Sequence, residues 1–248
     1  MTAWTRAPEA VFAGFAPAAA VGPASALLTE EDRQAAAGLP PLRRAEFSRG
    51  RTLLRWTLRW ACPGPAAGRP VRATGRGRPV LDTDPLIGVS VSHCADLLAA
   101  AVAPGRDVGI DVEQPIPPTP GLLRRLCPPP ACTGQPGAAS QPLRLAQLWT
   151  VHEACAKATG TGLGREFPRI EVGEGQSAGT HDGLEWLLLP CIYGAAAALA
   201  LGSGQTRPST VRLAFPGTDS LAPGRPEPSC FDLRTPNPAA PFPPGGRP

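Results

Sequence analysis

A five-residue motif at positions 109–113 (GIDVE) constrains this chain more than any other part of its sequence. Apolar residues alternate here with Gly109, Asp111 and Glu113, and this alternation is typical of a β-strand. Side chains two positions apart on a strand point to the same face, so Asp111 and Glu113 should present two carboxylates side by side. A lone pair of this kind is most often a solvated face, and only a second motif gives it a chemical role.

The second motif is the segment 149–157 (WTVHEACAK), which is typical of a helix. Residues four apart on a helix are neighbours, so Glu153 should lie beside Lys157. Lys157 is the only lysine among 24 lysine and arginine residues, which indicates a position that needs a compact ammonium. The alternative is an ordinary surface Glu–Lys pair. With Asp111 and Glu113, these side chains suit a divalent cation bound together with a phosphate-rich ligand.

The composition limits the class of protein and partner. A chain of 248 residues can form one large domain or two small ones. The net charge of +4 is compatible with an anionic ligand or an acidic protein partner. Aromatic residues make up only 5% and the arginines are scattered, so no nucleic-acid partner is expected. The seven cysteines form no C-x-x-C pair, which disfavours a disulfide framework and favours a reducing cytoplasm.

Two apolar segments resemble targeting signals. Residues 11–26 are rich in Ala and Phe, but Pro17 and Pro23 interrupt them, so secretion is not expected. Residues 187–201 contain Pro190 and are too short to span a bilayer comfortably, so no membrane insertion is expected. We therefore expect a cytoplasmic protein.

Periodicity and helix breakers predict a mixture of helices and strands. Thr29 should cap a helix with an acidic first turn, and residues 69–78 should be a loop or an edge strand. Residues 115–142 should be irregular, with at most a short helix at 122–126. The other expected helices are 42–61 and 145–158, and the expected strands are 89–93, 97–103, 108–113, 167–172, 184–189, 193–201 and 211–215.

A helix followed by strands occurs in each half of the chain, which predicts an α+β fold of two similar α/β subdomains. The first subdomain is expected at residues 1–104 and the second, with the two motifs, at 105–215. Beyond residue 203 the chain is rich in proline and poor in apolar residues. Residues 216–248 are therefore expected to form a disordered tail.

The motifs together resemble those of the 4'-phosphopantetheinyl transferase family, specifically the larger single-chain type that serves peptide and polyketide synthetases. The resemblance runs in order from about residue 43 to residue 172. Its signals are GIDVE at 109–113, WTVHEACAK at 149–157, Ser92-His93 at the end of a strand, Gly77-Arg78-Pro79, and the helix segment RTLLR at 51–55.

This resemblance implies a pseudo-twofold arrangement of the two subdomains, with the active site and coenzyme A between them. It implies transfer of the 4'-phosphopantetheine arm of coenzyme A to a serine of an apo acyl or peptidyl carrier protein, with Mg2+ present. The other product is adenosine 3',5'-bisphosphate. Positioning and charge stabilisation should supply most of the rate, because little covalent chemistry is needed. We expect a monomer.

The resemblance also assigns roles to single residues. Asp111, Glu113 and Glu153 would hold the metal, and Glu153 could also help to deprotonate the serine. Lys157 would steady the pyrophosphate as its bond breaks.

The remaining roles that the resemblance implies concern binding of coenzyme A. Ser92 and His93 would contact its phosphates. Arg51 and Arg78 would lie near its 3'-phosphate and adenosine, where the arginine fork can bond two oxygens at once. Arg43 or Arg44 would join them.

Three features depart from the family pattern. His152 stands where a lysine usually precedes the helix glutamate, which removes a fixed charge and would weaken coenzyme A binding. Residues 127–130 (CPPP) offer no acidic residue where many relatives carry one. The long Pro/Gly loop and the tail have no counterpart that we can place. These departures leave open a catalytically weakened pseudoenzyme of the same fold.

Two further alternatives belong to other classes. A generic Mg2+-dependent phosphohydrolase would release phosphate from nucleotides without a carrier protein. A zinc-stabilised interaction module would use soft ligands, although no standard zinc spacing fits. Its candidate ligands are His93, Cys94, Cys127, Cys132, His152 and Cys155.

Overall fold

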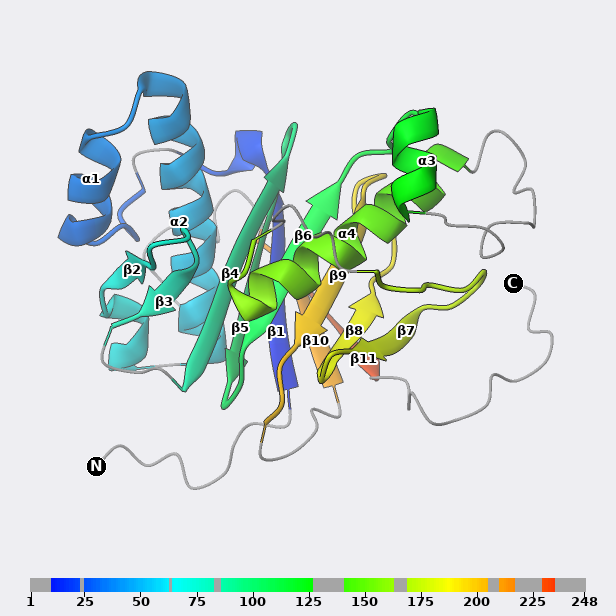
Figure 1. The fold of residues 1–248 in the computed structure, drawn as a ribbon. Helices are drawn as coiled ribbons and strands as arrows, with labels where there is room; N and C mark the ends of the chain where they lie inside the picture. The colour runs from blue at the N-terminus through cyan, green and yellow to red at the C-terminus, as the bar shows by residue number, and fades with distance from the viewer. Residues whose placement is uncertain are drawn as a thin grey trace.

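The computed structural model describes residues 10–22, 25–62, 64–82, 86–126, 141–162, 169–204, 210–216 and 229–234 (Figure 1). Its helices are α1 (Glu30–Ala37), α2 (Pro41–Ala61), α3 (Pro120–Leu126) and α4 (Gln141–Thr159), with 3-10 turns at Ala18–Ala20 and Pro65–Gly68. Its strands are β1 (Ala10–Pro17), β2 (Val71–Ala73), β3 (Pro79–Leu81), β4 (Ile87–Cys94), β5 (Leu97–Pro104), β6 (Val108–Glu113), β7 (Ala178–His181), β8 (Leu184–Leu188), β9 (Ala196–Leu201), β10 (Thr210–Phe215) and β11 (Ser229–Arg234).

The beginnings of the first two helices follow local sequence signals. The Thr29 hydroxyl accepts a hydrogen bond from the Asp32 amide, and Asp32 accepts one from the Thr29 amide, which forms the capping box expected before α1. Helix α2 begins at Pro41, whose missing N–H costs nothing in the first turn. Among the described residues, no helix combines the length and the apolar character that a membrane crossing needs.

The strands form two larger sheets and a hairpin. The first sheet has the order β11-β10-β1-β5-β4, and the second has the order β6-β9-β8-β7. Strand β2 lies within 69–78, where a loop or an edge strand is expected, and it pairs with β3 in a two-stranded sheet, which confirms the edge strand at 71–73. This mixture of helices and sheets confirms the predicted α+β class.

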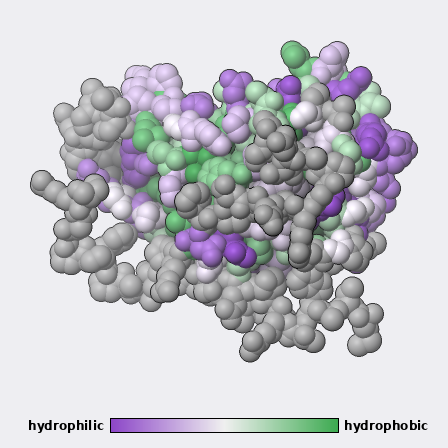
Figure 2. All heavy atoms as spheres, turned by 180° about the vertical axis from the view of Figure 1, so that it is seen from behind, coloured by the Kyte–Doolittle hydropathy of each residue, from purple (hydrophilic) through white to green (hydrophobic). Residues whose placement is uncertain are grey.

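The elements stack in four layers (Figure 1). Helix α2 packs against one face of the first sheet through residues such as Leu53 and Leu58. The other face of that sheet packs against the second sheet, where Phe15 and Ile110 share one core. Helix α4 covers the outer face of the second sheet. Seen from behind the view of Figure 1, the surface shows hydrophobic residues bordered by hydrophilic ones (Figure 2).

The chain returns to the first sheet after completing the second, which differs from the expected division at residue 215. Strand β10 pairs in parallel with β1, with Val211 opposite Val11, so residues 210–215 belong to the first sheet. Strand β11 then pairs with β10 inside the range expected to be a tail, and at these six residues that expectation is wrong. Most of the remaining tail lies outside the described residues.

The strand predicted at 167–172 is also wrong for its described part. Residues 169–172 have no strand partner, and side chains of α4 bond to their backbone instead. The strand predicted at 193–201 begins only at Ala196, because Tyr193 and Gly194 have positive φ angles of 50° and 78° and form a tight turn.

Helix α4 approaches β6 closely at Gly109, the first residue of the strand motif. A Cβ atom at this position would lie 1.9 Å from the Ala154 carbonyl oxygen and 2.6 Å from the Ala158 nitrogen. Both atoms belong to the helix backbone, so no side-chain rotation relieves the contact. The glycine therefore sets the distance between the strand and the helix that carry the two motifs.

We predict that Gly109→Ala lowers the free energy of unfolding by about 3 kcal/mol or more, because α4 must move away from β6. Urea unfolding of the variant and the unmodified protein measures the change. Gly22→Ala is the matched control, since a Cβ there meets no atom within 4 Å. Equal stability of the two variants would contradict the close contact.

Candidate active site

Strand β4 of the first sheet faces β6 of the second, and two serine side chains connect them. The Ile110 amide donates to Ser90 Oγ at 3.1 Å, and the Val112 amide donates to Ser92 Oγ at 3.4 Å. Amides two residues apart on a strand point to the same side, so both are directed towards β4. Each hydroxyl accepts a hydrogen bond that a carbonyl of a neighbouring strand would otherwise accept, so Ser90 and Ser92 join β6 to β4.

An ion pair between Lys157 of α4 and Asp111 of β6 forms the centre of the site. Lys157 Nζ lies 2.7 Å from Asp111 Oδ1, and it also donates to Ser92 Oγ at 2.9 Å and to the Ile110 carbonyl at 3.2 Å. Ser92 Oγ lies 2.6 Å from the same Asp111 oxygen. The Asp111 side chain is 7% exposed and that of Lys157 is 29% exposed. Three predicted site residues from three elements therefore meet at the boundary between core and solvent.

Glu113 and Glu153 complete an acidic cluster around this ion pair. Both are half-buried, and burial raises the pKa of each carboxyl above its usual value. The charge of Asp111 raises both pKa values further, whereas Lys157 lowers them in part. The Gln114 amide donates to Glu113 Oε1 at 2.9 Å and also lowers the pKa of that carboxyl. Asp111 and Glu113 are thus close enough to Glu153 to raise the pKa of its carboxyl.

This donor set suits Mg2+ bound together with a phosphate ligand. Asp111 Oδ2 is buried and has no hydrogen-bond partner in the described part of the chain, and a cation would satisfy it. No three His, Cys, Asp or Glu side chains of the described residues converge as a metal cage. Mg2+ is usually bound by one or two carboxylates plus phosphate and water rather than by such a cage. The residues therefore fit the ion that the sequence predicts.

The soft ligands of the zinc alternative receive no support within the described ranges. Burial is the main cause that raises the pKa of the Cys94 thiol to about 11 and that of Cys155 to about 12. These shifts disfavour the thiolate form that zinc binds, and no three His, Cys, Asp or Glu side chains of the described residues are arranged to hold a metal ion. Cys127 and Cys132 lie outside the described residues, as does the rest of the loop at 127–140.

His93 and Arg78, predicted to contact coenzyme A, flank the elements that carry the cluster. His93 follows Ser92 on β4, points to the other face and is exposed. Arg78 forms an ion pair with Asp107, immediately before β6, and packs against Gly160 at the end of α4. Lys157 lies in that same last turn of α4. Their contacts with coenzyme A stay predictions.

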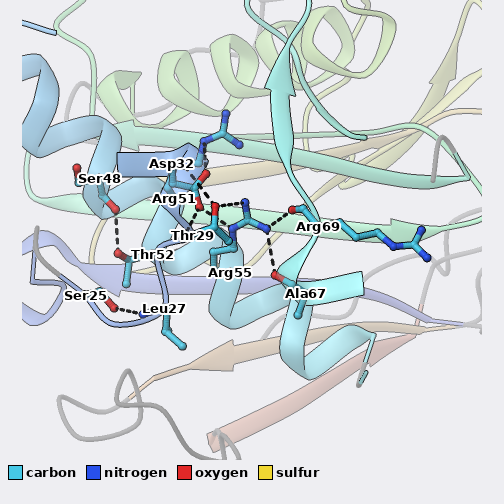
Figure 3. Close-up of polar contacts among 10 residues, drawn as sticks. All are labelled: Ser25, Leu27, Thr29, Asp32, Ser48, Arg51, Thr52, Arg55, Ala67 and Arg69. Atoms are coloured by element: carbon cyan, nitrogen blue, oxygen red, sulfur yellow. Dashed lines mark hydrogen bonds and ion pairs between the residues drawn. The ribbon is translucent and has the colours of Figure 1, made fainter. Parts of the chain in front are cut away.

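A buried arginine that sequence reasoning missed organises the first subdomain (Figure 3). Arg55 Nε lies 2.7 Å from Asp32 Oδ2, and both side chains are 1% exposed. The same guanidinium donates to the carbonyls of Ala67 and Arg69. It therefore ties α1 and α2 to the segment before β2, and its position within the helix pattern gave no sign of a buried acidic partner.

Arg51, predicted to bind the 3'-phosphate, lies beside this buried cluster (Figure 3). Its Nε is 3.8 Å from Asp32 Oδ1, its guanidinium stacks over the Phe47 ring at 5.0 Å, and its side chain is 8% exposed. Burial lowers the pKa of Arg51 to about 10, although the Asp32 charge acts in the opposite direction. Nη1 has no partner within the described residues. A phosphate contact by Arg51 stays a prediction, and the structure pairs this residue with Asp32.

Arg43 and Arg44, the other predicted basic contacts, both bond at the α1–α2 corner. Arg43 pairs with Glu46 at 2.9 Å on the surface. Arg44 donates to the carbonyls of Ala37 and Leu39, both at 3.1 Å, at the end of α1. The Arg44 bonds satisfy carbonyls at and just after the end of α1. No bond described for either arginine reaches the acidic cluster.

His152 is buried rather than placed on the ligand side of α4. Its Nδ1 lies 2.7 Å from the Leu148 carbonyl, and its Nε2 accepts a hydrogen bond from the Ile170 amide at 3.3 Å. The carbonyl can only accept and the amide can only donate, so the ring is neutral with its proton on Nδ1. Arg144 donates to the Val172 carbonyl at 2.6 Å and fixes the same segment. The side chain faces the core, and the weaker coenzyme A binding expected from this position stays a prediction.

A groove opens beside Glu113 at the end of β6. It has a volume of about 410 Å³ and is lined by Glu113, Gln114, Pro115, Ile116, Pro117, Leu122 and Trp149. Its lining is mainly apolar, with one carboxylate of the acidic cluster at its edge. The groove can therefore hold an extended, mostly uncharged chain whose charged end lies at the cluster.

Two family models match this chain. Residues 107–183 match the family model of the 4'-phosphopantetheinyl transferase superfamily. Residues 30–103 match that of the 4'-phosphopantetheinyl transferase N-terminal domain. The two matches together cover more than half of the chain and include every site residue named above. No curated protein matches the chain.

We predict that Glu153→Gln raises the Tm of the metal-free protein at pH 8 by about 1–3 °C. A carboxyl with a raised folded-state pKa lowers stability above that pKa, and the loss disappears as pH falls below the pKa of the unfolded chain. The gain should therefore shrink between pH 8 and pH 4, as measured by thermal unfolding with a chelator. Glu46→Gln, a surface control, should change Tm little at any pH. A lower Tm for Glu153→Gln at pH 8 would contradict the raised pKa of Glu153, to which burial and the neighbouring carboxylates contribute.

Proposed function

The chain belongs to the 4'-phosphopantetheinyl transferase superfamily, and from this premise we propose its reaction in detail. It moves the phosphopantetheine arm of coenzyme A to a serine hydroxyl of an apo acyl or peptidyl carrier protein, with Mg2+ present. A bond forms between the serine oxygen and the β-phosphorus, the pyrophosphate bond breaks, and adenosine 3',5'-bisphosphate leaves. The observation that carries the proposal is the cluster of Asp111, Glu113, Glu153 and Lys157 where the two sheets meet.

Asp111 would hold the Mg2+ ion through its unpartnered Oδ2. Glu113 and Glu153 would complete the ligand set by turning towards the ion, because no three carboxylates of the described residues converge as a cage without it. When bound, the ion neutralises charge on the pyrophosphate oxygens as the bond breaks. The carboxylates would also orient the ligand indirectly, because its anionic pyrophosphate would approach the cation that they hold. Their like charges repel one another without a cation, which is consistent with the raised pKa values of both glutamates.

Lys157 would contact the pyrophosphate from the last turn of α4. An ammonium has three N–H donors, and Lys157 already has acceptors in Asp111, Ser92 and Ile110. At least one of these bonds must be shared or exchanged when a phosphate oxygen approaches. The ammonium is small and its stem flexible, so such an exchange needs little movement, which explains a lysine in a chain otherwise rich in arginine.

Glu153 is the proposed acceptor for the serine proton. In the metal-free protein burial raises the pKa of its carboxyl, which favours proton uptake, and its half-buried position leaves it accessible. Glu113 has the same direction of shift, but the Gln114 amide already occupies its Oε1. We therefore assign proton acceptance to Glu153.

The apolar groove beside Glu113 is the proposed path of the pantetheine arm. The arm is extended and uncharged, and it begins at the phosphate that the acidic cluster would hold. Trp149, Leu122 and Ile116 supply apolar contact, and Gln114 supplies a polar group for an amide of the arm. His93 and Arg78 would then take phosphates at the opposite, adenosine end.

The proposal predicts that an apo carrier protein gains the mass of one phosphopantetheine arm when incubated with this protein, coenzyme A and Mg2+. Intact-mass spectrometry measures the gain on one acyl and one peptidyl carrier. A carrier with its acceptor serine replaced by alanine should gain nothing, and chelation of Mg2+ should stop the reaction. No gain on either carrier would contradict the proposal and favour the pseudoenzyme.

Asp111→Asn should reduce the transfer rate by at least about 100-fold while the protein stays folded, because the central carboxylate charge is lost. Asp82→Asn is the matched control, since Asp82 pairs with Arg72 on the surface next to the β2–β3 hairpin. Initial rates of arm transfer at saturating coenzyme A separate the two. Equal rates for both variants would remove Asp111 from the site.

A further inference from the structure

Ser92 uses its entire hydrogen-bonding capacity within the cluster. Lys157 Nζ lies 2.9 Å from its oxygen, the Val112 amide lies 3.4 Å from it, and Asp111 Oδ1 lies 2.6 Å from it. An ammonium and an amide can only donate, so both lone pairs of the hydroxyl accept. Its proton must therefore go to Asp111. The residue is buried, which keeps water from replacing these partners.

The hydroxyl determines which oxygen of Asp111 remains available. Oδ1 accepts from both Ser92 and Lys157, whereas Oδ2 is buried and has no partner within the described residues. Rotation of the carboxylate would break two charge-assisted hydrogen bonds at once. The carboxylate is therefore fixed with Oδ2 free.

The hydrogen bonds of Ser92 to Asp111 and Lys157 also join the two subdomains. Ser92 belongs to β4 in the first sheet, whereas Asp111 and Lys157 belong to β6 and α4, which pack together in the second subdomain. The cluster is thus incomplete without a side chain from the first subdomain. Ser90, two residues earlier on β4, bonds to the Ile110 amide in a similar way but touches neither Asp111 nor Lys157 in any bond described for it.

We infer that Ser92 is a positioning residue that fixes Asp111 and Lys157 relative to each other, so that Oδ2 faces the cation and the ammonium lies beside it. This inference rests on the proposed function for its consequence in catalysis. It assigns Ser92 a role different from direct contact with coenzyme A. Ser90 supplies the same kind of strand connection without that role, so the two serines form a matched pair for a test.

The test uses the ligand-free protein labelled with 15N at the lysine side chain. Lys157 is the only lysine, so the spectrum contains a single lysine ammonium signal. Ser92→Ala should speed hydrogen exchange at that ammonium about tenfold, because one of its acceptors is lost. Ser90→Ala should leave the exchange rate unchanged. Equal exchange rates in the two variants would overturn the inference.

Ser92→Thr keeps the hydroxyl, so it tests the inference even if Ser92→Ala fails to fold. It should retain the slow exchange of the unmodified protein, and fast exchange in folded Ser92→Thr would overturn the inference. In the transfer assay, Ser92→Ala should raise the Mg2+ concentration for half-maximal rate about tenfold, and Ser90→Ala should not. The exchange measurement needs neither coenzyme A nor a carrier protein. It therefore decides the role of Ser92 even if the proposed transfer fails.

Discussion

The ion pair between Lys157 and Asp111 is the interaction on which the rest of this site depends. It joins α4 to β6 at 2.7 Å, and Ser92 brings β4 of the other sheet to the same oxygen. Helix α4 can reach Asp111 only because Gly109 lets its backbone lie against the strand. The first subdomain is held together by a different buried pair, Arg55 with Asp32. Packing and charge thus converge where the two sheets meet.

The acidic cluster illustrates a conflict between stability and chemistry. Asp111, Glu113 and Glu153 lie close enough that burial and mutual repulsion raise the pKa values of both glutamates. A protein selected for stability alone would not place them together, because each partly buried charge lowers the stability of the ligand-free fold. Among the described contacts of the cluster, Lys157 is the one positively charged side chain that bonds to a carboxylate. The remaining negative charge suits Mg2+ and explains why a metal and an anionic ligand would bind together.

Local patterns predicted the parts of the site that lie on single elements. Strand alternation placed Asp111 and Glu113 on one face, and helical spacing placed Lys157 on α4. The parallel pairing of β10 with β1 was not predictable, because it joins segments at opposite ends of the chain through backbone bonds. The burial of His152 and Arg51 could not be predicted from local patterns either, because their partners Ile170 and Asp32 lie far away in sequence. The resemblance of motifs identified Ser92 but not the groups that its hydroxyl contacts.

The most direct measurement of the central claim is paramagnetic broadening of the single lysine signal by Mn2+, used in place of Mg2+. The account places the cation next to Asp111, whose Oδ1 is 2.7 Å from Lys157 Nζ. Compared with Mg2+, Mn2+ added with coenzyme A should broaden the Lys157 signal in the unmodified protein, whereas in Asp111→Asn the two metals should give the same line width. A signal that stays sharp in the unmodified protein at saturating Mn2+ and coenzyme A would contradict the site described here.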